Sequence, residues 1–333
     1  MRNKIVDQDL KEIISEDLPW KKLFNSTVVI TGASGILPSY LVETLLYLNE
    51  IFDANIKVIG IIRNFAKALK RFSTYEGRRD LILIKHDVCL PFTYEGDVDY
   101  VIHAAGQASP KFYGKDPVGT LEGHAIGTEN FLKFAAEKKV KCFLYFSSCS
   151  IYDNIDSMNL RSCYPLGKLV GENLCVAYNH QYGVPFEILR IAHTYGPEMP
   201  LNDGRVFADF VANILHNEDI SMNSDGSAER PMLYISDAVR AYFRILLEGK
   251  NAEAYNVASE EYITILDLAR MLVNLYPEKN LKINFNKQIP KGYIPAEKNQ
   301  DKRIDISKLK NLGWQQKYSV REGFIRTIES FQC

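Results

Sequence analysis

Six short runs of apolar residues, separated by helical or polar stretches, restrict the fold of this 333-residue chain more than any other feature. The runs are TVVITG (27–32), IKVIGIIR (56–63), DLILIKHDV (80–88), VDYVIHAAG (98–106), KCFLYFSSCS (141–150) and FEILRIAHTYG (186–196). Continuous apolar runs of this length are typical of strands buried on both faces of a parallel sheet. Helices are expected at 37–50, with a proline in the first turn, and from about 127 to 138. The sequence therefore predicts an α/β fold with a doubly wound parallel sheet.

The segments on either side of the six runs have other patterns. Residues 8–24 suggest a short helix with an apolar side, so residues 1–25 are expected to form a helical extension of the sheet domain at 26–196. After Gly196, turns such as LNDGR and SDGSAER interrupt the apolar stretches. We therefore predict a smaller mixed region at 197–333, of which about 231–258 packs back onto the sheet.

Composition excludes several classes of protein. The apolar content of 46%, the charged content of 24% and the net charge of −1 are those of an ordinary globular protein without a basic surface for nucleic acid. No apolar run is long enough to cross a membrane, and the first residues lack the apolar centre of a signal peptide. The six cysteines show no spacing typical of a metal site, so we expect no metal, reduced thiols and a cytoplasmic location.

The first run leads into TGASG, a strand-to-helix turn that contains Gly32 and Gly35. Glycines at this spacing allow a close approach of the backbone to a diphosphate, and the following helix N-terminus offers free N–H groups. The third glycine of the usual pattern is Pro38 here, a change that concerns helix packing more than phosphate contact. An ordinary strand-to-helix turn is the alternative, but its place after the first strand favours a dinucleotide site.

The residues after the second and third runs bear on the choice of cofactor. An acidic residue after the second strand holds the ribose hydroxyls of NAD, whereas an arginine suits the 2′-phosphate of NADP. This chain has Arg63 there, followed by Lys67 and Lys70. Arg63 favours NADP by its charge, although it can equally be a solvated strand end. Asp87, which closes the third run, is placed to contact adenine.

The segment SCYPLGK (162–168) places Tyr164 and Lys168 on one face of a helix, although proline and glycine lie between them. A free tyrosine, with a pKa of about 10, is a poor base at neutral pH. A nearby ammonium and a positively charged nicotinamide lower that pKa, so Tyr164 can remove a proton from a sugar hydroxyl. Ser147 and Ser148 end the fifth run at the ligand-binding edge of the sheet, and Ser148 is expected to hydrogen-bond the same sugar oxygen. Taken alone, the pair could be a half-buried tyrosine beside a solvated lysine.

Several motifs together resemble the extended short-chain dehydrogenases/reductases, the nucleotide-sugar epimerases, dehydratases and decarboxylases. They are TGASG, DV (87–88), HAAG (103–106), SSCSIY, YPLGK and RIAHTYGP, and further segments such as RSCYPLGK and LNDGRVFADF look most like UDP-glucuronate decarboxylases. The resemblance covers about residues 27–314. It implies an NAD(P)-binding Rossmann domain, a C-terminal region that binds a nucleotide-diphosphate sugar, a tightly held nicotinamide cofactor and a homodimer.

The resemblance also implies roles for individual residues. The catalytic residues are Ser148, Tyr164 and Lys168. The expected contacts with NAD, or with NADP, are Gly32, Ser34, Gly35, Ile36, Arg63, Asp87, Val88, Ala104, Ala105, Gly106, Tyr164 and Lys168. The expected contacts with the nucleotide sugar are Lys111, Tyr113, His193, Asn202, Arg205, Arg230 and Arg303, of which the three arginines suit a diphosphate because their forked donors match its oxygens.

The chain departs from its relatives beside the catalytic serine. The decarboxylases have a glutamate two residues before the tyrosine of the fifth-strand motif, and the 4,6-dehydratases have an Asp-Glu pair, where this chain has Cys149 and Ser150. A 4-epimerase needs no such carboxylate. We therefore predict oxidation of C4 of a nucleotide-linked sugar followed by epimerisation, with decarboxylation and 4,6-dehydration as alternatives. His193 and His124 also stand where relatives have asparagine, and His193 is a candidate proton donor to a keto-sugar.

Two other interpretations remain open. A catalytically silent protein that senses nicotinamide redox state would need none of Ser148, Tyr164 and Lys168. A simple dehydrogenase would release its cofactor in each turnover and consume it stoichiometrically.

Overall fold

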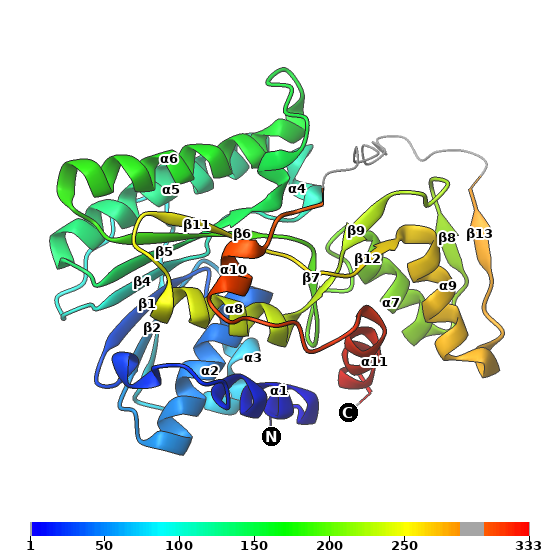
Figure 1. Ribbon diagram of the computed structural model, residues 1–333, viewed down its shortest axis with the longest axis horizontal. Coiled ribbons are helices and arrows are strands. Elements are labelled where there is room, and N and C mark those ends of the chain that lie inside the picture. Colours follow the sequence, from blue (N-terminus) through cyan, green and yellow to red (C-terminus); the bar gives the residue numbers. More distant parts are fainter. Residues whose placement is uncertain (1, 287–302, 333) are drawn as a thin grey trace.

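The computed structural model describes residues 2–286 and 303–332, and within them seven strands form one parallel sheet in the order β3-β2-β1-β4-β5-β6-β11 (Figure 1). The strands are β1 (Thr27–Thr31), β2 (Lys57–Ile62), β3 (Leu81–Lys85), β4 (Tyr100–His103), β5 (Cys142–Ser148), β6 (Phe186–Ile191) and β11 (Glu253–Val257). The order runs outward in both directions from β1 and β4, so the predicted doubly wound sheet is confirmed. The edge strand β11 was not predicted.

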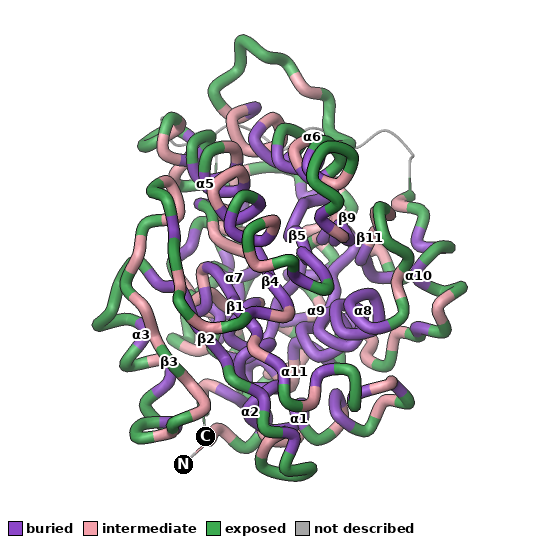
Figure 2. The backbone as a smooth tube through the Cα atoms, turned by 90° about the vertical axis from the view of Figure 1, so that its left-hand side faces the viewer, coloured by how far each residue is buried: buried purple, intermediate pink, exposed green. Residues whose placement is uncertain are grey.

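Helices cover both faces of this sheet. One face carries α5 (Pro117–Lys138) and α6 (Cys163–Tyr182), and the other carries α2 (Ile36–Phe52) and α8 (Ile235–Glu248) (Figure 1). Figure 2 shows that the central strands of the sheet are buried, whereas the edge strand β3 and many loop residues are partly or fully exposed. The two faces have separate apolar cores, because the side chains of adjacent strand residues point to opposite faces.

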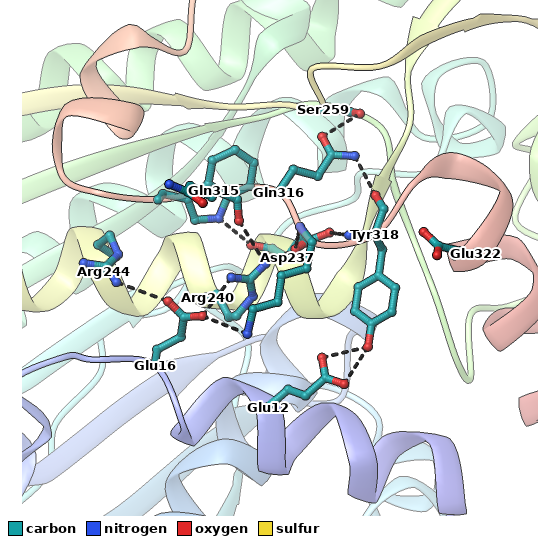
Figure 3. Close-up of polar contacts among 12 residues, drawn as sticks. Glu12, Glu16, Asp237, Arg240, Arg244, Ser259, Gln315, Gln316, Tyr318 and Glu322 are labelled. Carbon is teal, nitrogen blue, oxygen red and sulfur yellow. Dashed lines mark hydrogen bonds and ion pairs between the residues drawn. The ribbon is translucent and has the colours of Figure 1, made fainter.

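The N-terminal extension is a helix over a shorter and earlier segment than the predicted 8–24. Helix α1 (Lys4–Ile14) begins after Asn3, whose side chain accepts from two backbone N–H groups, and only a 3₁₀ turn (Trp20–Leu23) follows. Pro19 disfavours helical backbone at the residue before it, which explains the break. Helix α1 packs on α2, α8 and α11 (Val320–Ser330), and Figure 3 shows the polar contacts that Glu12 and Glu16 make with the C-terminal segment and with α8.

Helix α5 begins ten residues before the predicted start near 127. Asp116 caps it by accepting from Gly119 N at 3.1 Å, and Pro117 occupies the first helical position, where its missing N–H costs nothing. Glycines at 119, 123 and 127 weaken the helical signal of the sequence here. The expected sixth strand is also shorter, because β6 ends at Ile191 and β7 (Thr194–Tyr195) pairs with β10 (Leu233–Tyr234) instead.

The C-terminal region is mixed and lies at the carboxyl side of the sheet (Figure 1). Two small ladders pair β9 (Glu229–Pro231) with β12 (Tyr262–Thr264) and β8 (Ile220–Met222) with β13 (Ile283–Phe285). The remaining described helices are α3 (Phe65–Arg71), α4 (Pro110–Tyr113), α7 (Val206–His216), α9 (Ile265–Leu275) and α10 (Ser307–Asn311). Helix α8 lies in sequence after β8 and β9 and before β12 and β13, and it packs against β6 and β11, so it returns the chain to the sheet.

Two features of the whole chain complete the description. Cys89, Cys142, Cys149, Cys163 and Cys175 are free thiols, and Cys333 lies outside the described residues. In the part of the chain that is described, no helix combines the length and the apolar character needed to cross a bilayer.

Candidate active site

The turns after β1 and β4 touch each other at the point where the strand order reverses. Gly32 has φ +66°, and a Cβ on it would lie 3.0 Å from Ala105 Cα. Thr31 Oγ1 accepts from Ala104 N and Ala105 N, each at 3.0 Å, and so ties the two turns together. These two turns form a cradle at the switch point of the doubly wound sheet, and it has no room for a side chain at Gly32. Such a cradle fits the diphosphate of a dinucleotide.

Helix α2 begins directly after this turn. Gly35 is its N-cap, and among the described residues no side chain caps the helix. The first N–H groups of α2 are therefore available to an anion, and the helix dipole favours negative charge there. Ser34 and Ile36 lie on either side of the cap, and Pro38 is accommodated in the first turn.

The ends of β2 and β3 lie beside the cradle and carry the residues expected near the adenosine. Arg63 and Asp87 are both exposed, each just beyond the end of its strand. Asn130 Nδ2 donates to Val88 O at 2.9 Å and fixes the backbone after Asp87. The structure thus places Arg63, Asp87 and Val88 at one edge, whereas their preference for NAD or NADP stays a prediction.

Strand β5 and helix α6 bring the three predicted catalytic residues together. Ser148 is the last residue of β5, and Tyr164 and Lys168 lie in the first two turns of α6. The Ser148 side chain lies near enough to the Tyr164 phenol to act on its pKa. Lys168 Nζ lies 5.8 Å from the centroid of the Tyr164 ring and donates to Phe146 O at 2.5 Å. The lysine is therefore anchored behind the tyrosine by the backbone of β5.

Burial dominates the protonation of this pair. It raises the pKa of Tyr164 above its ordinary value, and the polar side chain of Ser148 and the charge of Arg205 only partly oppose it. Burial also lowers the pKa of Lys168 to about 7, against the charge of Glu172. Both shifts favour the neutral forms, so the phenolate needs a further positive charge beside it to form at neutral pH.

The glycines of α6 explain the poor helix formers beside Tyr164. A Cβ on Gly167 would lie 2.9 Å from His124 Cβ on α5, and one on Gly171 would lie 2.0 Å from the Tyr145 hydroxyl on β5. The helix can approach α5 and the sheet only because these positions lack side chains. Pro165 lies in the first turn, where proline is tolerated.

Two aromatic groups hold the ring of Tyr164. Tyr113 stacks on it with ring centroids 5.2 Å apart, and His124 meets it edge-on at 5.2 Å. Burial and the charge of Lys168 hold the pKa of His124 well below its usual value, so this imidazole is neutral. Tyr113 and His124 therefore orient the phenol without adding a charge to it.

Four of the expected nucleotide-sugar contacts lie together: Lys111, Tyr113, Asn202 and Arg205. Tyr113 and Arg205 both donate to Ala108 O, at 3.1 Å and 3.3 Å. Lys111 Nζ donates to Asn202 O at 3.3 Å, which joins α4 to the loop before α7. Arg205 also pairs with Asp203, at 2.8 Å, so part of its charge is already compensated.

His193 lies close enough to Arg230 and Arg205 for both charges to act on it. His193 is exposed to solvent. Burial and the charges of Arg230 and Arg205 lower the pKa of His193 to about 3, which favours its neutral form, and its role as a proton donor to a keto-sugar stays a prediction. The contact of Arg303 is with the Tyr262 ring, at 4.9 Å, and its role toward a substrate stays a prediction.

Sequence reasoning missed two features of the site. Ser150 Oγ donates to Ser148 Oγ at 2.9 Å, so Ser150 supports the catalytic serine directly. Glu172 accepts from Ser147 and pairs with Arg190 behind Lys168. The signal for Glu172 was present, because it lies four residues after Lys168 and so on the same helical face.

Comparison with known proteins assigns the chain to a family. Residues 28–258 match the model of the NAD dependent epimerase/dehydratase family. The chain belongs to this family. The expected resemblance to extended short-chain dehydrogenases/reductases is confirmed, and the protein is an NAD-dependent nucleotide-sugar enzyme.

Two similar proteins are named UDP-glucuronic acid decarboxylases. UDP-glucuronic acid decarboxylase 6 of Arabidopsis thaliana is 33% identical, over 92% of this chain and 89% of its own length. UDP-glucuronic acid decarboxylase 1 of Danio rerio is 31% identical, over 91% of this chain and 72% of its own length.

Solved structures of epimerases share the fold. UDP-glucose 4-epimerase from Thermotoga maritima, in complex with UDP-glucose, has a TM-score of 0.77 at 21% identity and covers 92% of this chain and 98% of its own. UDP-glucuronic acid 4-epimerase from Bacillus cereus, in complex with UDP-glucuronic acid and NAD, has a TM-score of 0.76 at 24% identity, with 92% and 99% covered.

Proposed function

We propose that the protein is a UDP-sugar 4-epimerase that oxidises C4 of its substrate to a ketone and reduces it again from the opposite face. The observation that carries the proposal is the segment after β5. Ser148 lies against Tyr164, and Cys149 and Ser150 follow it where the decarboxylases have a glutamate. This arrangement supplies a base and a hydrogen-bonding hydroxyl for C4 without a further carboxylate.

Three side chains have separate roles in the proposed oxidation. Bound NAD supplies the hydride acceptor for C4 and later the hydride for the ketone. Tyr164 takes the proton of the C4 hydroxyl, while Ser148 hydrogen-bonds the same oxygen and orients it. The ammonium form of Lys168 stabilises the Tyr164 phenolate. In the reduction, Tyr164 returns the proton to the oxygen, so protons and electrons balance over the cycle.

The substrate we propose to test first is UDP-glucuronic acid. The names of the Arabidopsis thaliana and Danio rerio relatives and of the Bacillus cereus epimerase all contain this sugar acid. We propose that Arg205, Arg230 and Arg303 bind the diphosphate, because guanidinium groups match phosphate oxygens. The residues proposed to contact the sugar are Lys111, Tyr113, His193 and Asn202.

Decarboxylation is the second candidate, and the similarity to the decarboxylases over 92% of the chain favours it. A ketone at C4 of a glucuronic acid stands β to the C6 carboxylate. The C5–C6 bond can then break, with its electron pair delocalised onto the ketone oxygen, and carbon dioxide leaves. Groups other than a glutamate would have to protonate C5 afterwards.

One experiment separates these functions. The purified protein is incubated with UDP-glucuronic acid, UDP-glucose and other nucleotide sugars, and the products are identified by mass spectrometry and by carbon dioxide release. A 4-epimer of unchanged mass supports the proposal, and a pentose nucleotide with carbon dioxide supports decarboxylation. A redox sensor would give no product, and a simple dehydrogenase would consume added cofactor stoichiometrically.

We also propose a homodimer formed through α5 and α6. Their outer faces expose the apolar side chains of Val118, Leu121, Ile126, Leu169, Val170 and Val176, which are more than a third exposed in the single chain. Apolar side chains gathered on two adjacent helices are typical of a protein–protein interface. Light scattering of the purified protein gives its mass directly. The cytoplasmic location expected from the sequence is likewise a proposal, based on the free thiols.

A further inference from the structure

Glu172 is a buried carboxylate one helical turn beyond Lys168, and the proposed reaction does not use it. One of its oxygens accepts from Ser147 Oγ at 2.5 Å and from Arg190 Nε at 3.0 Å. The other accepts from Arg190 Nη2 at 2.6 Å. Glu172 is only 7% exposed, and a carboxylate so far removed from water is stable only when its charge is paired. These contacts fix β5, α6 and β6 against one another.

The hydrogen bonds continue from Arg190 toward the C-terminal region. Arg190 Nη1 donates to the Tyr152 hydroxyl at 2.7 Å, and that hydroxyl donates to Asn256 Oδ1 at 2.8 Å. Asn256 Nδ2 in turn donates to the backbone carbonyl of Asp305 at 2.7 Å. Asp305 lies two residues after Arg303, which is a proposed diphosphate contact. A continuous chain of hydrogen bonds therefore links the catalytic strand to a substrate-binding segment.

We propose that this chain is a positioning network that keeps the catalytic groups and the substrate-binding segment in register. The network consists of Ser147, Glu172, Arg190, Tyr152 and Asn256. At one end it holds the residue before the catalytic serine, and at the other it holds the backbone beside Arg303. The network is separate from the reacting atoms. The proposal rests on a nucleotide sugar being bound at Tyr164, but not on which product is released.

The two halves of the network differ in strength. The Glu172–Arg190 pair is largely buried and charge-assisted, so removing either partner would leave a buried charge unpaired. Tyr152 is 52% exposed, so water can replace its contacts and the fold does not depend on them. Loss of the Tyr152 hydroxyl therefore tests the link to the substrate-binding segment without unfolding the protein.

The buried half also acts on the charge of Lys168. The groups that face Lys168 are Tyr164 and Glu172 on its own helix, Tyr145 on β5, His103 on β4 and His124 on α5. Of these named groups, Glu172 is the one carboxylate, and its negative charge raises the pKa of Lys168 against the effect of burial. Glu172→Gln removes that charge and keeps the size of the side chain, so Lys168 should lose its proton at a lower pH.

The first test compares Tyr152→Phe with Tyr182→Phe. Tyr182 is a matched control, because it is 57% exposed and its hydroxyl also accepts a hydrogen bond, from Gln181. We expect Tyr152→Phe to raise the KM for the nucleotide sugar about fivefold, with kcat within about twofold of the unmodified protein, as for loss of one modest hydrogen bond. Titration with UDP by calorimetry should show the same loss of affinity, whatever the product. Equal behaviour of the two variants, or a lower melting temperature without a change in affinity, would overturn the proposal.

The second test is the pH profile of kcat. Glu172→Gln should move its alkaline limb to lower pH, while Tyr152→Phe should leave the limb in place. A Glu172→Gln protein that folds and keeps the unmodified profile contradicts the proposal. If the unmodified protein converts no nucleotide sugar but binds UDP, the proposed function fails, and the UDP affinities still decide the inference.

Discussion

The hydroxyl of Ser150 donates a hydrogen bond to Ser148 Oγ at 2.9 Å, and Ser150 N donates to the same atom at 3.1 Å. Two donors directed at Ser148 Oγ leave its own proton free to point toward Tyr164 and a substrate oxygen. Ser150 therefore replaces the carboxylate of the decarboxylases with a group that orients the catalytic serine. A glutamate at position 150 would therefore remove the hydrogen bond from the Ser150 hydroxyl to Ser148 and add a carboxylate beside the catalytic serine.

Ser150→Glu should fold normally and release more carbon dioxide from UDP-glucuronic acid than the unmodified protein does. Position 150 is only partly buried, at the open end of β5, so a carboxylate there can stay solvated. Carbon dioxide release and the melting temperature are measured for both proteins. Brisk release by the unmodified protein would instead make decarboxylation the native reaction and contradict the proposed epimerisation.

Tyr164→Phe should lower kcat by about 100-fold or more, because the phenolic oxygen is the proposed base and such a group contributes at least that factor. The phenyl ring keeps the stacking on Tyr113 and the edge contact with His124, so the fold and the affinity for NAD should be unchanged. Steady-state kinetics and NAD titration check both parts. Near-normal turnover by this variant would rule out the mechanism.

Gly167→Ala should destabilise the protein although alanine is the better helix former. The new methyl group would lie 2.9 Å from His124 Cβ, which is fixed close to the backbone of α5. Overpacking of this kind costs about 1–3 kcal/mol, against a gain of about 1 kcal/mol from helix propensity. Gly114→Ala is the control, since a Cβ there would meet nothing within 4 Å and the φ of Gly114 is not positive. Denaturant unfolding should separate the two variants, and equal stabilities would contradict the close packing of α5 on α6.

The sequence predicted the sheet well, because β1, β2, β4 and β5 are buried over almost their whole length and are therefore mostly apolar. It did not predict β11, whose polar Glu253 and Asn256 suit an edge strand but hide the apolar pattern. The start of α5 was missed because its glycines serve close packing rather than helix formation.

The same contrast holds in the candidate site. Ser148, Tyr164 and Lys168 were found because they lie in short segments whose spacing has a chemical meaning. Two contacts were not predicted: the stacking of Tyr113 on Tyr164 and the Glu172–Arg190 ion pair. Each joins residues that only the tertiary fold brings together.

Arg63→Ala should weaken NADP binding selectively if Arg63 faces the 2′-phosphate. Arg63 is exposed just beyond the end of β2, where a 2′-phosphate on the adenine ribose is expected. A charge-assisted contact with phosphate is worth about tenfold in affinity. Fluorescence titration with NAD and NADP measures both affinities, and Lys70→Ala on the neighbouring helix is the control for general charge. An equal loss for both cofactors, or no loss, would identify Arg63 as a solvated strand end.

Lys168→Met should abolish efficient turnover yet stabilise the cofactor-free protein near neutral pH. Burial lowers the pKa of Lys168 to about 7 from an ordinary value of 10.5, so between these values the unfolded chain binds more protons than the folded one. Stability therefore rises with pH across this window, and the full cost of Lys168 is present below it. The gain in melting temperature of Lys168→Met should be largest at about pH 6, at a few degrees, and should shrink toward pH 10. Melting curves over this range measure the difference, and a gain independent of pH would show that the buried ammonium is not its cause.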